Sequence, residues 1–206
     1  MARTFLRPAL TASLAATCAL TSMAAWAGDK GMTGVPLAWT PTSTLAESVG
    51  PLNLLPLAGA KIWIQPFTDT RPDKAVVGEN QEKSVPRAIT TKDDVAAFLG
   101  EHMTSLYKEA GLPMAAKPGE ATVLVSVEVL RCKVTEKDTY KGELSLMVEV
   151  KSGGKALWRG TVLGEATRWG RSFKLENYHE AICDSLMDAV GKSLKSDAFL
   201  KALATR

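Results

Sequence analysis

Apolar residues alternate with other residues through the middle of the chain, across residues 121–170. Valine occupies every second position from Val123 to Val129, and Leu or Val does the same from Leu144 to Val150. A spacing of two places such side chains on one face of a β-strand. The Gly-Gly pair within 152–155 suits a tight hairpin turn, and a third strand follows it. The pattern predicts a three-stranded antiparallel meander with one apolar face.

The third run of this meander, 156–170, has a less regular pattern than the other two. We expect one set of its side chains to face the core and another to face away. The inward set is predicted to be Leu157, Thr161 and Leu163, and the outward set Trp158, Val162 and Ala166. Gly160 and Gly164 would permit a bulge.

An earlier strand is predicted over residues 61–67, where Ile62 and Ile64 alternate with polar or amphipathic residues. Pro66 lacks a backbone donor and therefore ends the strand or keeps it at a sheet edge. The segment that follows, to Thr90, has no helical period. Such a long unstructured stretch is unusual in a compact domain. Either 75–78 and 88–90 pair briefly with other segments, or this is a functional loop.

Three helices are predicted from apolar residues at three- and four-residue steps and from end signals. The first begins with Thr91 as its cap and ends at Gly111. The second begins at Asn177, with Glu180 placed as in a capping box. A short terminal helix follows a Ser196 cap. The order strand, helix, three strands, helix predicts an α+β fold: a four-stranded, mostly antiparallel sheet with its helices on one face.

Residues 1–27 have the layout of a secretory signal peptide. Arg3 and Arg7 precede an apolar run, which ends in Ala25-Trp26-Ala27. Cleavage after Ala27 would release the protein into the periplasm of a Gram-negative bacterium. The alternative is lipidation at Cys18, which would anchor it to the outer or inner membrane. Thr17 is an unusual neighbour for a lipidated cysteine.

Two further segments follow the leader. Residues 28–59 contain four prolines and are predicted to be an arm or linker, part of which lies across the domain. Its leucines, from Leu52 to Leu57, would alternatively form an exposed docking strip. Residues 60–206 are predicted to form a single α+β domain.

Net charge excludes one class of partner. The formal charge is +3, and removal of Arg3 and Arg7 with the leader leaves 23 basic against 22 acidic residues. A nucleic-acid-binding protein needs a basic stripe that displaces counterions. We therefore expect no nucleic-acid partner.

No pattern in the chain indicates a catalytic, cofactor or metal site. His179 and Cys183 lie four residues apart, as two zinc ligands on a helix would, but no third ligand motif follows. The interpretation that we favour is a helix start with an exposed histidine and a buried cysteine. We therefore expect no enzyme and no cofactor; an uncharacterised hydrolase is the weakest alternative.

Cys132 and Cys183 are the cysteines that remain when the leader is removed. Two cysteines in an exported protein suggest a disulfide. Cys132 lies near the end of a predicted strand and Cys183 on a helix that should cross the sheet, so the two can be close. Two separately buried thiols are the alternative.

Two groups of residues are candidates for a partner surface. Asp69, Arg71 and Asp73 follow the first strand, and Trp158, Arg168, Trp169 and Arg171 lie in the last strand and its exit. Trp and Arg are frequent anchors of protein interfaces. The alternative is a local role: turn amides and an ion pair in the first group, and core filling with one exposed cation in the second.

Over residues 61–203 the layout resembles the YajG-like family of bacterial envelope lipoproteins. The shared features are the first strand with Asp69-Thr70-Arg71, the long loop, the helix at Thr91, the alternating strands and a short last helix with Phe199. The resemblance implies a small exported lipoprotein without an established enzymatic activity. The sequence therefore predicts a non-enzymatic envelope protein that binds an envelope protein partner. The alternative is an accessory subunit of a lipid-transport or secretion system.

Overall fold

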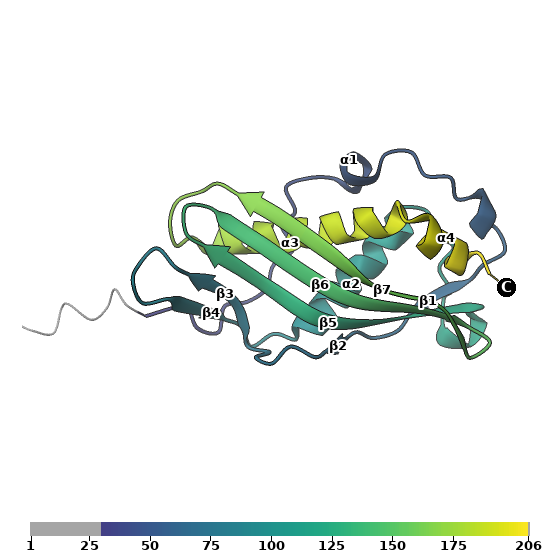
Figure 1. Ribbon diagram of the computed structural model, residues 1–206, viewed down its shortest axis with the longest axis horizontal. Helices are drawn as coiled ribbons and strands as arrows, with labels where there is room; N and C mark the ends of the chain where they lie inside the picture. The colour runs from purple at the N-terminus through teal and green to yellow at the C-terminus, as the bar shows by residue number, and fades with distance from the viewer. Residues whose placement is uncertain (1–29, 206) are drawn as a thin grey trace, which may run out of the picture. The chain divides into compact units, whose positions relative to one another are not determined.

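The computed structural model describes residues 30–205, and from Gly31 onward these residues form one compact unit. The predicted leader and Cys18 lie outside the described residues. The unit is α+β: a seven-stranded sheet is covered on one face by helices (Figure 1). The main path of the sheet runs β4-β3-β5-β6-β7. The sequence predicted four strands and therefore underestimated the size of the sheet.

The predicted meander is present as β5 (Val123–Glu136), β6 (Tyr140–Ser152) and β7 (Lys155–Arg168), which pair antiparallel. The alternating valines of β5 are all buried. β5 is longer than predicted, and its register with β6 shifts between Val129 and Arg131. After this bulge the inward positions resume at Cys132, Val134 and Glu136.

The prediction for the faces of β7 was wrong. Val162 is buried and Trp158 packs against the core, whereas Leu157 and Leu163 are exposed. A register shift between Val150 and Lys151 accompanies this difference. A shift of one residue moves every following side chain to the opposite face of a strand.

The first predicted strand, over residues 61–67, is confirmed as the shorter β1 (Ile62–Ile64). The strands that the sequence pattern did not show clearly are also short. β1, β2 (Thr68–Asp69) and β3 (Val76–Asn80) pair one after another along β5, each parallel to it. β3 also pairs antiparallel with β4 (Arg87–Thr90). The stretch before Thr90 therefore contains two paired strands, as the first of the two alternatives expected. Strands of two to five residues are too short to show a clear alternation.

The helices were predicted with partly wrong starts. α2 (Val95–Glu109) is capped by Asp94, whose carboxylate accepts from the Ala97 N–H, and Thr91 lies before it. α3 (Leu175–Leu194) begins two residues before Asn177 and has no side-chain cap. The end at Gly111, with a φ of 84°, and the Ser196 cap of α4 (Asp197–Leu203) are confirmed.

Close contact between α3 and the sheet depends on two glycines. A Cβ at Gly164 of β7 would lie 1.9 Å from the Ser185 carbonyl oxygen, and one at Gly142 of β6 would lie 2.4 Å from the Ala181 oxygen. The small residues of the helix and the bare strand backbone therefore fit directly together.

The described part of the Pro-rich arm packs on the domain. The Val35 N–H donates to the Thr90 carbonyl, so the arm covers the free edge of β4. Its short helices, α1 (Leu45–Val49) and the 3₁₀ helix η1 (Leu55–Leu57), bury Leu45, Val49 and Leu57. Leu55 instead points to solvent and is 82% exposed. A second 3₁₀ helix, η2 (Pro118–Glu120), precedes β5.

Candidate functional site

Three connections meet at one end of the sheet, at the left of Figure 1. Asn80 at the end of β3 pairs with Glu136, Glu136 pairs with Tyr140, and Tyr140 pairs with Arg168 at the end of β7. The connections β3–β4 (81–86), β5–β6 (137–139) and β7–α3 (169–174) therefore lie side by side. We call these three loops together the loop end.

Glu136 is the centre of a buried polar network beneath the loop end. The bulge in β5 turns its side chain into the core, where the residue is 1% exposed. Its carboxylate accepts the Tyr178 hydroxyl at 2.5 Å and the Phe173 backbone N–H at 2.6 Å. A buried carboxylate needs such donors, because burial without them carries a large desolvation penalty. The same contacts fix the 169–174 loop to the sheet.

The Tyr140 hydroxyl ties the same loop down at two more points. It donates to the Arg171 carbonyl at 2.6 Å and accepts from the Lys174 N–H at 3.1 Å. The Asn177 side-chain amide also donates to the Arg171 carbonyl, at 3.1 Å. The Tyr140 and Tyr178 rings meet edge to face, with centroids 5.0 Å apart. The loop backbone is thus held from the sheet and from α3.

Arg87 and Phe173 join the first and third loops. The guanidinium of Arg87 lies 4.0 Å from the centre of the Phe173 ring and donates to Asn80 Oδ1 at 2.8 Å. Phe173 has a φ of 55°, the single positive value among the described non-glycine residues. Such a backbone costs roughly 1–3 kcal/mol and persists where its surroundings enforce it. Ser172 also donates to Glu82 of the first loop.

The charges in this network are fixed at neutral pH. Burial raises the pKa of Glu136, but hydrogen bonds from Asn80, Tyr178 and Phe173 together outweigh burial and hold that pKa below its usual range. Burial and the neighbouring carboxylate raise the pKa of the Tyr178 hydroxyl, and burial raises that of Tyr140. Glu136 is therefore an anion and both tyrosines are neutral donors.

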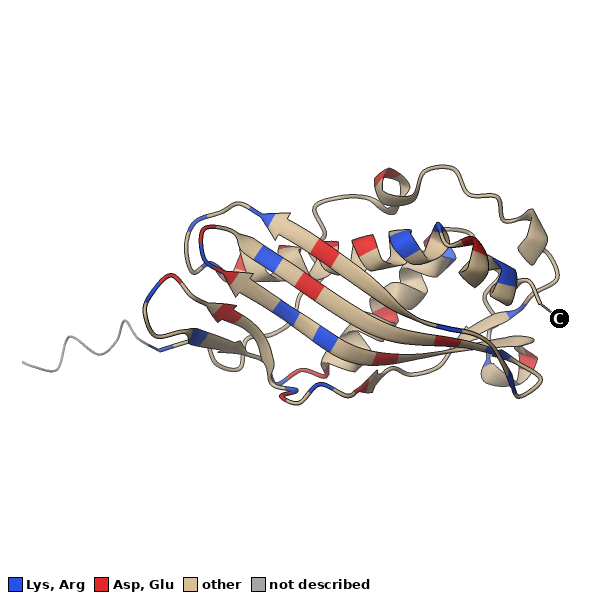
Figure 2. Ribbon diagram, in the orientation of Figure 1, with Lys and Arg blue, Asp and Glu red and all other residues tan. Residues whose placement is uncertain are grey.

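The loop end presents two apolar side chains on this rigid support. Trp169 is 78% exposed and Val85, in the first loop, is 65% exposed. Arg171 and Lys174 are exposed beside Trp169. Figure 2 shows Lys and Arg in blue on the loops of this end. An exposed tryptophan on a loop that is tied to the sheet at Arg171, Phe173 and Lys174 has the character of a preformed contact surface.

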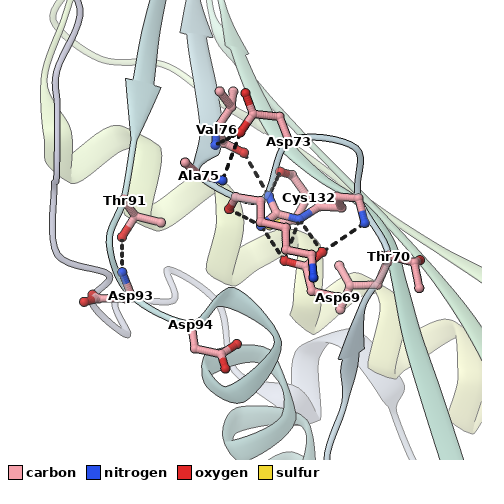
Figure 3. Close-up of polar contacts among 12 residues, drawn as sticks. Asp69, Thr70, Asp73, Ala75, Val76, Thr91, Asp93, Asp94 and Cys132 are labelled. Atoms are coloured by element: carbon pink, nitrogen blue, oxygen red, sulfur yellow. Dashed lines mark hydrogen bonds and ion pairs between the residues drawn. The ribbon is translucent and has the colours of Figure 1, made fainter.

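The predicted group Asp69, Arg71 and Asp73 has a local role. The Arg71 side chain, 4% exposed, binds the Asp69 carboxylate at 2.8 Å and donates to the carbonyls of Lys74, Val76 and Cys132. Burial raises the pKa of Asp69, but Arg71 outweighs burial and lowers it. The Asp73 carboxylate accepts from two turn amides (Figure 3). This group holds the turn between β2 and β3.

The predicted group of Trp158, Arg168, Trp169 and Arg171 does not form one surface. Trp158 packs on Phe199 with ring centroids 5.3 Å apart, near the opposite end of β7. Ten residues of strand separate it from Arg168, which is about 33 Å. Arg168 lies 3.4 Å from Glu180 and 3.5 Å from Asp184. Trp169 and Arg171 alone belong to the loop end.

Cys132 and Cys183 carry free thiols, both buried, and no bond joins them. Burial raises the pKa of Cys132 to about 12 and that of Cys183 to about 11. The Cys183 thiol donates to the Ala38 carbonyl, so it holds the arm. The predicted disulfide is therefore not formed in this structure.

Both histidines also hold the arm. His179 is buried, not exposed as predicted, and its Nε2 lies 2.8 Å from the Pro36 carbonyl oxygen. His102 of α2 stacks on Trp39 with centroids 4.1 Å apart. Within residues 30–205 no group of three or more His, Cys, Asp or Glu side chains is placed to hold a metal ion.

One apolar groove lies away from the loop end. It has a volume of about 490 Å³ and runs between residues 49–57 of the arm and the junction of α3 with α4. Leu52, Leu194 and Leu200 line it, and Lys195 and Lys201 stand beside it. In the described part of the chain, no helix is long and apolar enough to cross a membrane.

No family model and no curated protein sequence matches the chain. Among solved structures, a Xanthomonas campestris protein of the family named DUF330 is 10% identical, with a TM-score of 0.52, over 80% of this chain and 89% of its own. The two share a fold. At this identity the likeness extends to the fold alone.

Two other solved structures are more distant. PelC from Paraburkholderia phytofirmans, a dodecamer, is 13% identical with a TM-score of 0.43 over 77% of this chain and 94% of its own. The lipoprotein GNA1162 of Neisseria meningitidis is 13% identical with a TM-score of 0.30 over 52% of this chain and 83% of its own. The resemblance to the YajG-like family stays a prediction.

Proposed function

We propose that the chain is a non-enzymatic exported protein that binds another component of the bacterial envelope through the loop end. The observation that carries this proposal is the exposure of Trp169 on a loop held by Glu136, Tyr140 and Arg87. A contact surface that is rigid before binding loses little conformational entropy when it binds.

The internal contacts favour this proposal over an enzyme. Glu136 and Tyr140 use their polar atoms to hold the 169–174 loop, and the Tyr178 hydroxyl donates to Glu136. Each histidine contacts the arm. A nucleophile or general base needs reach to a reacting group, whereas these side chains are committed to the fold.

The leader pattern supports a periplasmic location, with a membrane anchor if Cys18 is lipidated. Mass spectrometry of the mature N-terminus decides between these two forms. A chain beginning at Gly28 is soluble in the periplasm, whereas an acylated Cys18 is anchored.

Chemical crosslinking in envelope fractions tests the proposal. We expect the wild type to give reproducible adducts that Trp169→Ala reduces strongly. Leu55→Ala, which also removes an exposed apolar side chain, is the matched control and keeps the adducts. Adducts that survive Trp169→Ala would place the contact elsewhere.

The apolar groove favours a second candidate, an accessory subunit of a lipid-transport or secretion system. The groove lies between the arm and the terminal helices. Leu52→Glu would place a charge in this groove. Loss of envelope lipid transport in this variant, with Trp169→Ala unaffected, would favour the second candidate.

A further inference from the structure

We infer that the envelope component bound by the loop end is the surface of an anionic phospholipid bilayer, into which Trp169 and Val85 insert. This inference rests on the proposed function. It is carried by the apolar tips, the charge of the loops and the place where the described chain begins.

The apolar tips suit a membrane interface. Trp169 and Val85 project from different loops, which Ser172 and Glu82 join by a hydrogen bond. Tryptophan is enriched at membrane–water interfaces because its ring is amphipathic. The two exposed side chains therefore belong to loops that are joined to each other at the same end of the sheet.

The charge of the three loops complements anionic lipids. They contain Lys83, Lys137, Arg171 and Lys174, all exposed, against Glu82 and Asp138. Among the flanking charges, Arg87 offsets Glu136 and Lys141 offsets Glu176, while Arg168 lies within ion-pair distance of Glu180 and Asp184. A basic residue near an anionic membrane surface contributes about 1 kcal/mol of binding free energy.

The described chain begins at this same end of the domain. Gly31 lies against Ala88, and Ala88 belongs to β4, the strand that follows the first loop. A Cβ at Gly31 would lie 1.8 Å from the Ala88 carbonyl oxygen. Cys18 is thirteen residues before Gly31, so a lipid at Cys18 would be joined to the domain at this end of the sheet.

Vesicle binding tests the inference. The mature form that begins at Gly28 carries neither Cys18 nor the apolar run of the leader with Trp26, so neither can bind the vesicles. It is mixed with vesicles of phosphatidylcholine alone and with vesicles in which phosphatidylglycerol replaces part of it. We expect binding to the anionic vesicles, weaker binding to the neutral ones, and loss with added salt. Brominated lipids should quench tryptophan emission in the bound protein.

Matched variants assign the contact. Trp169→Ala should lower the vesicle partition coefficient roughly tenfold and remove the quenching. Arg171→Gln should lower the coefficient about fivefold. Leu55→Ala and Lys155→Gln, at exposed positions away from the loop end, should bind as the wild type does. Circular dichroism confirms that each variant is folded.

The inference is overturned if the wild type binds neither kind of vesicle, if Trp169→Ala binds as well as the wild type, or if Leu55→Ala weakens binding equally. If vesicle binding fails while crosslinking through Trp169 gives a protein adduct, the lipid inference falls and the proposed function stands. If neither is seen, both fall.

Discussion

The buried carboxylate of Glu136 accepts the backbone N–H of Phe173 at 2.6 Å, which fixes the strained loop that carries Trp169 to the end of the central strand β5. Glu136→Gln removes the negative charge and exchanges one acceptor oxygen for a donor. We expect the free energy of unfolding to fall by about 2 kcal/mol, because hydrogen bonds to a charged acceptor contribute roughly 1.5–3 kcal/mol. Denaturant unfolding measures this loss.

Glu128→Gln is the control for that change, since Glu128 is exposed on the outer face of β5. We expect its stability to stay within about 0.5 kcal/mol of the wild type. An equal loss in both variants would show that Glu136 has no special place in the fold.

The stability of the protein should decrease in acid. The pKa values of Glu136 and Asp69 are lowered in the folded state, so both bind protons more readily when the chain is unfolded. Their contribution is complete above the unfolded pKa values, near 4, and is lost as the pH falls through the lower folded values. Urea unfolding from pH 7 to pH 3 measures the slope. Glu136→Gln should have a shallower slope than the wild type, and an unchanged slope would contradict the assignment.

Gly164 should not tolerate a side chain. Alanine there would place its Cβ 1.9 Å from the Ser185 carbonyl oxygen, so α3 must move away from β7. Overpacking of this kind costs typically about 1–3 kcal/mol. Thermal unfolding should show a Tm lower by several degrees, at roughly 2–4 °C for each kcal/mol in a domain of this size. Gly119→Ala, where a Cβ meets nothing within 4 Å, is the control and should leave Tm nearly unchanged.

Arg71→Ala should be among the most destabilising substitutions in the β2–β3 region. It leaves the Asp69 carboxylate without its partner and removes the donor to the Val76 carbonyl. Breaking a buried ion pair by removing one partner costs about 3–5 kcal/mol. The control is Arg159→Ala, at an exposed position on β7. Chemical denaturation of both variants compares their losses in free energy of unfolding. Similar midpoints for the two would refute the structural role of Arg71.

Both thiols should be unreactive in the folded protein. Burial raises the pKa of each, and the thiolate is the form that reacts with disulfide reagents. A thiol-reactive chromogenic reagent should therefore detect Cys132 and Cys183 slowly in buffer and rapidly in denaturant. Absence of both thiols in denaturant without reductant would show the disulfide that the sequence suggested.

The sequence pattern predicted those parts of the fold that are local. The alternation from Val123 to Val129, the glycine at the end of α2 and the Ser196 cap depend on neighbouring residues, and all are confirmed. The side chain of Glu136 points inward because of the bulge in β5. After the bulge, positions 132, 134 and 136 are the buried ones, and this change of phase is only a weak signal in the sequence. The Glu136 partners Phe173 and Tyr178 come from distant segments, and no local pattern pairs them.

The candidate site was predicted only in part. Trp169 and Arg171 lie in the loop end, whereas Trp158 is separated from them by the length of β7. Residues near in sequence were grouped as one surface, but an extended strand carries them apart. Val85 was not singled out, because the sequence left the segment before Thr90 as either briefly paired or a functional loop. The pairing of β3 with β5 places the loop that carries Val85 at the loop end.

Site-specific photo-crosslinking in living cells tests the central claim most directly. A photoreactive amino acid replaces Trp169 in one variant and Lys155, in the hairpin at the other end of β7, in a second. The account predicts envelope adducts from position 169, of lipid if the bilayer inference holds, and few from position 155. Equal adducts from both positions, or none from position 169, would contradict the claim that the loop end is the contact surface.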